Sequence, residues 1–406
     1  MRVIYFHQHF TSPAGAGGIR SYEMARRLLH HGHQVTMVCG RYGLGNTGLD
    51  GPFVRGRRRG MVDGIDVVEF DLSYSNRDGL LKRTGTFLKY AWGSIKLALT
   101  ERYDLAFATS TPLTAGIPAI AARWLRGKPF VFEVRDLWPE LPREMGVITN
   151  PVILWAMGVL EYVSYHSAQR CVALSPGIAR GIAQRGISQE RIASVPNGCD
   201  IEIFRDAPGA WRPDGVADGD LLAVFTGTHG PANGLDAVLA AATVLKKRGR
   251  GDIKLLLIGD GKLKPALQAD AAARDLDNVL FHDPVGKSRL AGLLAGADLG
   301  LQILANVPAF YYGTSPNKFF DYIAAGRPVL NNYPGWLAEM ITETDCGFAV
   351  PPDDAEAFAD ALETAADDRA ALKRMGTNAA RLAEQRFDRA KLADQWVAWV
   401  TEGKRL

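Results

Sequence analysis

The sequence Ser315-Pro316-Asn317-Lys318-Phe319-Phe320-Asp321-Tyr322-Ile323-Ala324-Ala325-Gly326-Arg327-Pro328-Val329 predicts a loop, a helix from Asn317 and, after a Gly-Arg-Pro break, a strand. Lys318 falls in the first helical turn, where the positive end of the helix dipole disfavours a cation. An anion such as pyrophosphate would offset that cost, and the free N–H groups of a helix start bind anions. Asp321 lies one turn later on the same face and could accept hydrogen bonds from ribose hydroxyls. The alternative is an ordinary helix–strand unit with a solvated lysine and a capping aspartate.

Alternation of strand and helix extends from this unit through the whole chain. Strands separated by helices predict an α/β fold with parallel sheets covered on both faces, here two doubly wound, Rossmann-like domains facing a cleft. We expect strands at residues 2–6, 34–39, 65–70, 105–109, 130–134, 171–174, 192–195, 221–226, 254–258, 279–281, 299–303, 328–331 and 348–350. Helices are predicted at residues 19–30, 80–100, 114–125, 151–168, 177–184, 233–247, 262–274, 287–294, 317–325, 355–386 and 389–401.

The length of 406 residues favours two domains. A cluster of proline and glycine between residues 208 and 219 is the best linker candidate. We therefore predict an N-terminal domain at residues 1–205, a C-terminal domain at residues 206–385 and a final helical segment at residues 386–406.

Composition and charge restrict the class of protein. With 47% hydrophobic and 22% charged residues the chain is globular, and its four cysteines have no metal-ligand spacing. We expect a cytoplasmic protein, because no signal segment or membrane-spanning apolar run is present. Residues 1–200 hold 24 basic and 16 acidic residues, a balance of +8, whereas residues 201–406 hold 23 and 28, a balance of −5. This asymmetry suggests an anionic partner for the first half, such as a phosphorylated acceptor or a membrane surface, but not a nucleic acid.

A glycine-rich loop follows the first predicted strand of the second half. Glycines spaced closely before a helix let the backbone approach a phosphate, although a flexible turn has the same composition. A second tight turn, which includes Asp260, follows the next strand and should lie at the same sheet edge. The residues of the glycine-rich loop that we expect at the site are Gly227, Thr228, His229, Gly230 and Asn233.

The first half carries its own candidates at the ends of its strands. Gly17 and Gly18 enter a helix, but Arg20 stands where a dinucleotide fingerprint needs its third glycine, which favours a phosphate or sugar over a nicotinamide cofactor. His7 and His9 point the same way at the end of the first strand, and we prefer cleft-lining roles to metal binding because no third ligand is evident.

Charged residues also follow the strand predicted at residues 130–134. Arg135 and Asp136 could position hydroxyls or supply a base, while the alternative is an ion-paired loop that also contains Glu133. Ser175 has no partner at a recognised triad spacing, so a serine nucleophile is not expected.

A basic and aromatic region spans residues 55–59 and 80–92. It could lie on an anionic bilayer, peripheral on the inner face of the membrane. Equally, it could be a packed helix with solvated charges beside a mobile loop.

With these motifs in order, the chain resembles the retaining GT-B glycosyltransferases of family 4, most closely the branch that builds bacterial surface polysaccharides. The resemblance covers essentially the full length. The stretches that carry it are Arg135-Asp136-Leu137-Trp138-Pro139, Pro196-Asn197-Gly198, Gly227-Thr228-His229-Gly230, Asn233-Gly234-Leu235 and residues 315–329.

The resemblance implies roles for individual residues. Asp321 matches the carboxylate that holds the ribose, usually a glutamate, and Val285 matches a position whose backbone reads the nucleobase. The family's upstream glutamate would fall at Gly313 and a common basic residue near Asn233, so both are missing and Lys318 is the expected cation for the pyrophosphate. The last helix resembles one that crosses back onto the N-terminal domain. The implied donor-binding set is Gly227, Thr228, His229, Gly230, Asn233, Asp260, Val285, Ser315, Pro316, Asn317, Lys318 and Asp321.

The implied reaction is metal-independent glycosyl transfer with retention, from a nucleoside-diphosphate sugar, UDP more than GDP, to a saccharide or lipid-linked saccharide acceptor. No cofactor is expected, and no Asp-x-Asp motif lies near the predicted site. The catalytic candidates are Lys318, Asp136 and His9, and the acceptor-binding candidates are Gly17, Gly18, Arg20, Arg135 and Asp136. The alternatives are a sugar-nucleotide epimerase of similar fold and a non-enzymatic two-domain sugar-binding protein.

Overall fold

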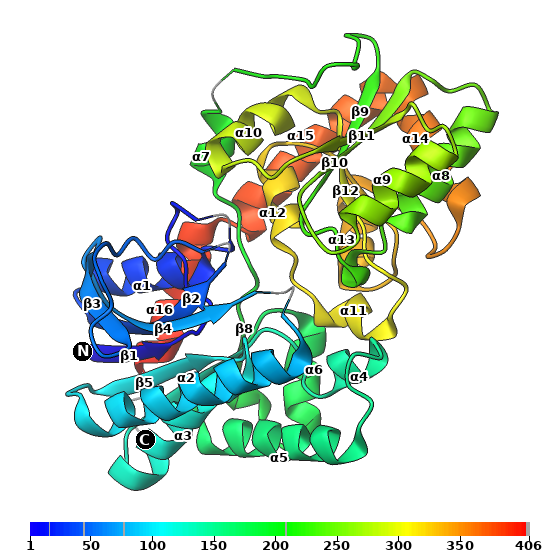
Figure 1. The fold of residues 1–406 in the computed structure, drawn as a ribbon. Helices are drawn as coiled ribbons and strands as arrows, with labels where there is room; N and C mark the ends of the chain where they lie inside the picture. Colours follow the sequence, from blue (N-terminus) through cyan, green and yellow to red (C-terminus); the bar gives the residue numbers. More distant parts are fainter. Residues whose placement is uncertain (16, 44, 76–77, 208, 403–406) are drawn as a thin grey trace. The chain divides into compact units, whose positions relative to one another are not determined.

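A computed structural model describes residues 1–15, 17–43, 45–75, 78–207 and 209–402 of the chain (Figure 1). The chain divides into two compact units. Unit 1 comprises Met1–Pro196, Gly313–Ser315 and Ala390–Leu406, and unit 2 comprises Asn197–Tyr312 and Pro316–Arg389. The division therefore falls after Pro196, earlier than the boundary predicted at 205/206. Residue 208 of the predicted linker and residues 403–406 of the predicted last segment lie outside the described residues.

Unit 1 is built on an eight-stranded sheet of order β3-β4-β2-β1-β5-β6-β7-β8. Every neighbouring pair is parallel except β3 and β4, which run antiparallel. The central strands are continuous apolar runs, as expected for a parallel sheet buried on both faces. The strands are β1 (Arg2–Phe6), β2 (Gln34–Tyr42), β3 (Arg57–Val62), β4 (Ile65–Tyr74), β5 (Leu105–Thr109), β6 (Phe130–Val134), β7 (Arg170–Ala173) and β8 (Ile192–Ser194).

Helices cover both faces of this sheet. One buried core joins the sheet to α2, α3, α5 and α6, which places these four helices on the same face, while α1 and α16 lie on the other (Figure 1). On that other face Trp396 of α16 is fully buried, stacks with Tyr5 and meets Phe107 edge to face. The helices are α1 (Arg20–His30), α2 (Leu80–Thr100), η1 (Leu113–Gly116), α3 (Ile117–Arg126), α4 (Glu140–Glu144), α5 (Pro151–Ser167), α6 (Pro176–Gln184), η2 (Gln189–Arg191) and α16 (Arg389–Thr401).

Local chemistry explains where two of these helices begin. The side chain of Asn150 accepts hydrogen bonds from the N–H groups of Val152 and Ile153, and Pro151 occupies the first position of α5. Ser175 caps α6 in the same way, by accepting from the N–H of Ile178. Ser175, which the sequence analysis did not expect to be a nucleophile, therefore has a structural role at a helix start.

Strand β3 corrects an expectation. The sequence analysis treated residues 55–59 as part of a basic membrane or mobile segment, but Arg57–Val62 pairs antiparallel with β4 and Val62 lies opposite Ile65. The connection is the dipeptide Asp63-Gly64, and both residues have positive φ angles, as a tight hairpin turn requires. The Asp-Gly pair was the sequence signal for this hairpin.

Unit 2 is built on a six-stranded parallel sheet of order β11-β10-β9-β12-β13-β14. Its core consists of side chains from β9, β10 and β12 with the helices that cover them. The strands are β9 (Leu221–Thr226), β10 (Ile253–Ile258), β11 (Val279–His282), β12 (Leu299–Gln302), β13 (Val329–Asn331) and β14 (Gly347–Ala349). The helices are α7 (Ile201–Arg205), η3 (Pro231–Asn233), α8 (Asp236–Lys247), α9 (Lys264–Ala273), α10 (Lys287–Gly296), α11 (Pro308–Gly313), α12 (Asn317–Ala324), α13 (Trp336–Thr344), α14 (Ala355–Asp367) and α15 (Arg369–Arg386).

The segment from Asn197 to α7 belongs to unit 2 for an electrostatic reason. Asp200 forms ion pairs with Lys287 of α10 and with Arg389. These pairs hold the segment to unit 2 before the chain enters β9. In the described part of the chain, no helix is both long and apolar enough to cross a membrane.

Candidate functional site

The loops at the carboxyl ends of β9 and β10 pack against each other so closely that only glycine fits. A Cβ atom on Gly259 would lie 1.7 Å from the carbonyl oxygen of Gly227, and both glycines have large positive φ angles. Two backbone hydrogen bonds join the loops, from the N–H of Gly227 to Ile258 at 2.9 Å and from the N–H of His229 to Asp260 at 3.0 Å. The predicted glycine-rich loop is therefore a fixed backbone surface at the edge where parallel α/β sheets bind ligands.

Lys318 lies against this loop. Its Nζ donates a hydrogen bond of 2.8 Å to Oδ1 of Asn233 and sits 3.9 Å from the centre of the Phe225 ring. A Cβ on Gly227 would lie 3.5 Å from the same Nζ, which is van der Waals contact and shows how closely the lysine approaches the loop. Asn233 in turn donates to the carbonyl of Thr228 at 2.7 Å. The structure thus brings four predicted residues together in direct contact.

The charge of Lys318 has no carboxylate to balance it within the described residues. Burial lowers the pKa of its ammonium group from 10.5 to about 7, because no charged group among the described residues offsets the loss of hydration. The lysine also occupies the first turn of α12, where the helix dipole opposes a cation. By contrast, the buried Lys264 of the same unit pairs with Asp283.

Tyr322 holds α12 in this position. Its hydroxyl accepts a hydrogen bond of 2.9 Å from the N–H of Thr226, the last residue of β9, and the ring is fully buried. The ring also packs against Gly300 of β12, where a Cβ atom would lie 2.3 Å from it. The first turn of α12 is therefore fixed relative to the loop after β9.

Asp321 belongs to a network of charges that sequence analysis missed. It is 9% exposed and lies 3.2 Å from Nζ of Lys287, which also pairs with Asp200. Burial raises the pKa of Asp321, and Lys287 partly offsets that effect. Although burial opposes the charge of Lys287, its two carboxylate neighbours raise its pKa. Lys287 is the first residue of α10, and nothing in its local sequence marked it as a partner of Asp321.

The remaining predicted donor residues occupy the same sheet edge or the start of α12. His229 is fully buried and burial lowers its pKa to about 4, which makes it neutral. Asp260 is exposed, and Val285 is half-buried in the loop between β11 and α10. Pro316 is the N-cap residue of α12, with Ser315 directly before it and Asn317 directly after it.

Glu133 is the centre of the candidate site of unit 1. It is fully buried and accepts hydrogen bonds from Arg20, at 3.1 and 3.0 Å, and from Arg135 at 3.1 Å. Although burial raises the pKa of Glu133, the two guanidinium groups lower it further, so the net direction is down. Arg20 also donates to the carbonyl groups of Val195 and Pro196. The hydrogen-bond donors of Arg20 thus stabilise the fold, as the ion-paired alternative predicts. The side chain of Arg135 remains partly exposed.

The other candidates of unit 1 lie at the ends of the same strands. Burial lowers the pKa of His9 to about 3, and the imidazole stacks on Tyr74 with 4.3 Å between ring centres. Burial raises the pKa of Asp136, against the effect of Arg135. A Cβ on Gly17 would lie 3.1 Å from the Cγ2 atom of Thr11, and Gly18 follows directly before the N-cap of α1.

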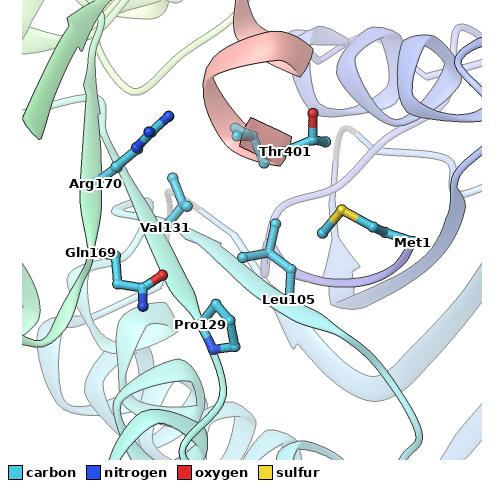
Figure 2. A pocket seen from close by; sticks show the side chains of 8 residues that line it. Met1, Leu105, Pro129, Val131, Gln169, Arg170 and Thr401 are labelled. Carbon is cyan, nitrogen blue, oxygen red and sulfur yellow. The ribbon is translucent and has the colours of Figure 1, made fainter. Parts of the chain in front are cut away.

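A cavity in unit 1 lies at the opposite edge of the sheet. It is lined by Met1, Leu105, Pro129 and Arg170, among others, which stand at the amino ends of β1, β5, β6 and β7 (Figure 2). Its volume is about 10 Å³, space for a single water molecule at most. It is a packing defect beside α16 rather than a ligand site. Among the described residues, no group of three or more His, Cys, Asp and Glu side chains is arranged to hold a metal.

Comparison with known proteins identifies both halves of the chain. Residues 15–198 match the family model of the glycosyl transferase 4-like domain, and residues 220–368 match that of the glycosyl transferases of group 1. A D-inositol 3-phosphate glycosyltransferase from Nocardia farcinica is 30% identical over 222 residues, 52% of this chain and 48% of that protein. The chain thus spans about half the length of the curated relatives it matches.

Solved structures share the fold over the whole chain. The sucrose-phosphate synthase of Thermosynechococcus elongatus superposes with a TM-score of 0.73 at 17% identity and covers 97% of each chain. Anabaena HepE, solved in complex with UDP and glucose, gives a TM-score of 0.69 at 16% identity and covers 99% of this chain and all of that one. Both are sequence-remote, so they establish the arrangement of strands and helices within each half and not the substrates.

We expect Gly259→Ala to destabilise the site more than an ordinary loop substitution does. The new methyl group would overlap the carbonyl of Gly227, and the φ of +149° is one that alanine avoids. Such strain costs about 1–3 kcal/mol, which would lower the melting temperature of the protein. Gly251→Ala is the matched control, because a Cβ there meets nothing within 4 Å. Equal melting temperatures for the two variants would contradict the close packing of the loops.

Proposed function

The chain belongs to the group 1 glycosyltransferases, and from this premise we propose that it transfers a sugar from a nucleoside-diphosphate sugar to an acceptor with retention of the anomeric configuration. The donor is bound by unit 2, and its nucleotide is UDP rather than GDP. The acceptor is bound by unit 1 and is a saccharide, carried on a lipid during the synthesis of a surface polysaccharide. No cofactor takes part, and the transfer does not require a metal ion.

One observation carries the proposal: among the described residues, no carboxylate forms an ion pair with Lys318. Lys318, Asn233 and the loop around Gly227 converge on one place at the carboxyl edge of the sheet. A diphosphate bound there would supply the missing negative charge and would accept hydrogen bonds from free N–H groups at the start of α12. A bound diphosphate would offset the desolvation cost of the Lys318 ammonium group, and this gain would contribute to the affinity for the diphosphate.

The same arrangement suits the departure of a diphosphate. In the transfer, the acceptor oxygen bonds to the anomeric carbon while the bond from that carbon to the phosphate oxygen breaks, and the acceptor proton passes to the departing phosphate. Charge grows on the leaving oxygen, so fixed donors aimed at it lower the barrier, commonly by several kcal/mol. Lys318 and the amides around Thr228–Gly230 and Ser315–Asn317 are those donors. No enzyme nucleophile is needed on this route.

Asp321 is the proposed ligand of the ribose hydroxyls. Lys287 lies beside it and favours its ionised form, which is the form that accepts two hydroxyl hydrogen bonds. The side chain of Asp321 is one turn from Lys318 on α12. This spacing lets one helix contact both the diphosphate and the sugar ring of the nucleotide. The backbone near Val285, two residues before Lys287, is the proposed contact for the base.

The groups proposed to receive the acceptor are Arg135, Asp136 and His9. The imidazole of His9 is neutral near pH 7, so it can exchange hydrogen bonds with a hydroxyl but adds no charge. Asp136, whose pKa is raised, lies at the end of the same sheet as Arg135. These groups suit a hydroxyl-rich saccharide, and we assign them to positioning the attacking hydroxyl.

Two comparisons support the choice of UDP and of a saccharide product. Anabaena HepE was solved with UDP-glucose, and Escherichia coli trehalose-6-phosphate protein was solved with UDP-2-fluoro glucose. A third neighbour, WaaG, is described as a glycosyltransferase of lipopolysaccharide biosynthesis. All three are below 25% identity to this chain, so they supply candidates for a first screen of donors and acceptors.

Lys318→Ala should abolish sugar transfer and weaken the binding of UDP in calorimetry. Loss of a cation buried against a diphosphate costs about 2 kcal/mol or more, roughly thirtyfold in the dissociation constant. Lys247→Ala is the matched control, since it removes the same charge from the exposed C-terminal turn of α8. Unchanged affinity of Lys318→Ala for both UDP and GDP would remove the basis of the proposed donor site.

The affinity for UDP should fall as the pH rises above 7. The free protein holds Lys318 with a pKa of about 7, and a bound diphosphate favours the ammonium form and raises that pKa. Binding therefore takes up a proton between the two pKa values, and the association constant falls by about tenfold per pH unit in that window. Below pH 7 the affinity levels off. Calorimetry at pH 8 in buffers of different ionisation enthalpy measures the number of protons taken up when UDP binds.

The variant Lys318→Arg tests whether Lys318, rather than another group, takes up the proton when UDP binds. An arginine stays charged over the whole range, so the variant should bind UDP without taking up a proton. Proton uptake by Lys318→Arg equal to that of the native protein would show that another group is responsible.

The product should have the same anomeric configuration as the donor, and EDTA should leave the rate unchanged. The test is NMR of the glycoside formed from a UDP-sugar with saccharide acceptors in the presence of the chelator. An inverted anomer, or a rate restored only by added divalent metal, would contradict the proposed mechanism. Conversion of the UDP-sugar to an epimer without acceptor would indicate the epimerase alternative instead.

A further inference from the structure

Helices α2, α3 and α5 of unit 1 expose large apolar side chains that soluble surfaces seldom collect in one place. The indole rings of Trp92, Trp124 and Trp155, one on each helix, are 79%, 70% and 70% exposed. These helices cover the same face of the eight-stranded sheet, α3 contacts the other two, and their outer surfaces face away from the core they share (Figure 1). We call this surface the three-helix face. Its exposed apolar residues are Leu81, Leu88, Trp92, Trp124, Leu125, Val152, Ile153, Trp155, Val159 and Tyr162.

The pattern along α2 is that of a helix lying at an interface. Leu81 and Leu88 are seven residues apart, so they lie on one side of the helix. Lys89 and Lys96 have the same spacing, one position further along, which places their ammonium groups beside the apolar side chains. No carboxylate among the described residues forms an ion pair with either lysine. Both charges are therefore free to meet an external anion.

The outward side of helix α5 is also apolar, but the side chains that form it are uncharged. Val152, Trp155, Val159 and Tyr162 recur at intervals of three and four residues, which form one outward side of the helix. Such a run normally faces a protein core. Here it faces away from the described parts of unit 1.

The three helices of this face expose no acidic side chain. The sequences of α2 and α3 contain no acidic residue, and the one acidic residue of α5, Glu161, is buried and paired with Arg185. Exposed Lys89 and Lys96 and the partly exposed Arg123 supply the cations, whereas Lys82 is paired with Asp78. An apolar, tryptophan-rich surface whose helices expose cations is complementary to a layer of anionic headgroups above hydrocarbon.

The basic strand β3 is not part of this surface. Arg58 pairs with Glu69, and Arg59 pairs with Asp66 and Glu101. These two charges are therefore neutralised by carboxylates of unit 1, whereas Arg55 and Arg57 of the same hairpin are exposed.

We propose that the three-helix face docks on an anionic lipid bilayer. Tryptophan and tyrosine prefer the level of the headgroups, and lysines beside them reach the phosphates while their methylene stems stay in the apolar layer. No helix inserts across the membrane, because the apolar sides of α2, α3 and α5 are one surface of a packed domain. The inference does not depend on the proposed function, since none of these residues belongs to the candidate donor or acceptor site.

Flotation with vesicles tests the proposal. The native protein should float with vesicles of phosphatidylcholine and phosphatidylglycerol at low salt, and not with phosphatidylcholine alone. High salt should reduce flotation, because it screens the lysine–headgroup attraction. Vesicles with brominated acyl chains should quench the tryptophan fluorescence, which requires no substitution. Protein that stays at the bottom with anionic vesicles at low salt would overturn the proposal.

Variants locate the surface. Lys89→Glu with Lys96→Glu should weaken partition at least about tenfold, because each lysine near an anionic surface contributes roughly a fivefold factor. Arg55→Glu with Arg57→Glu is the matched control, as it makes the same change of charge at exposed positions on the hairpin. The control should float like the native protein, and both variants should bind UDP with unchanged affinity. Equal loss of flotation in both variants would mean that only net charge matters.

A second pair of variants separates a bilayer from a protein partner. Trp92→Ser with Trp155→Ser should weaken flotation and leave the melting temperature unchanged, since both side chains are exposed. A concentration-dependent dimer that these substitutions abolish, in a protein that does not bind vesicles, would instead identify a second copy of the chain as the partner.

Discussion

The candidate site depends on one unbalanced charge. Lys318 is held at the positive end of α12, over the Phe225 ring, with the neutral side chain of Asn233 as its hydrogen-bond partner. The hydrogen bond from Thr226 to Tyr322 fixes α12 there, with the ammonium group against the loop that contains Gly227. A lysine in such a position lowers its pKa unless an anion arrives. The fold therefore keeps a cation without a carboxylate partner among the described residues, as the proposed diphosphate site requires.

The two units treat buried charge in opposite ways. In unit 1, Glu133 is matched by two guanidinium groups, and the imidazole of His9 is neutral. In unit 2, Lys318 is left unmatched while Asp321 and Lys287 offset each other. An edge of paired charges with a neutral imidazole suits a saccharide, and an edge with an unpaired lysine suits a diphosphate. This contrast supports the proposal that acceptor and donor bind to different units.

Hydrophobic periodicity was sufficient to predict the parallel sheets, because strands such as β9 and β10 are buried on both faces and are therefore apolar throughout. It failed at β3, where arginine at three consecutive positions hides the alternation of an edge strand, and where the Asp63-Gly64 turn was the remaining signal. The units divide after Pro196, and proline and glycine content does not report that Asp200 binds Lys287 and Arg389.

The sequence by itself determined that a lysine would stand in the first turn of a helix after a glycine-rich loop, because helix starts and tight turns are encoded by neighbouring residues. Only the tertiary structure decided which charges remain unpaired. Lys287 and Asp321 are 34 positions apart in the sequence, and Arg20 and Glu133 are 113 apart. The pairing of each depends on the sheet that brings its elements together. The same holds for Trp92, Trp124 and Trp155, whose common exposure follows from three helices packed on one face of a sheet.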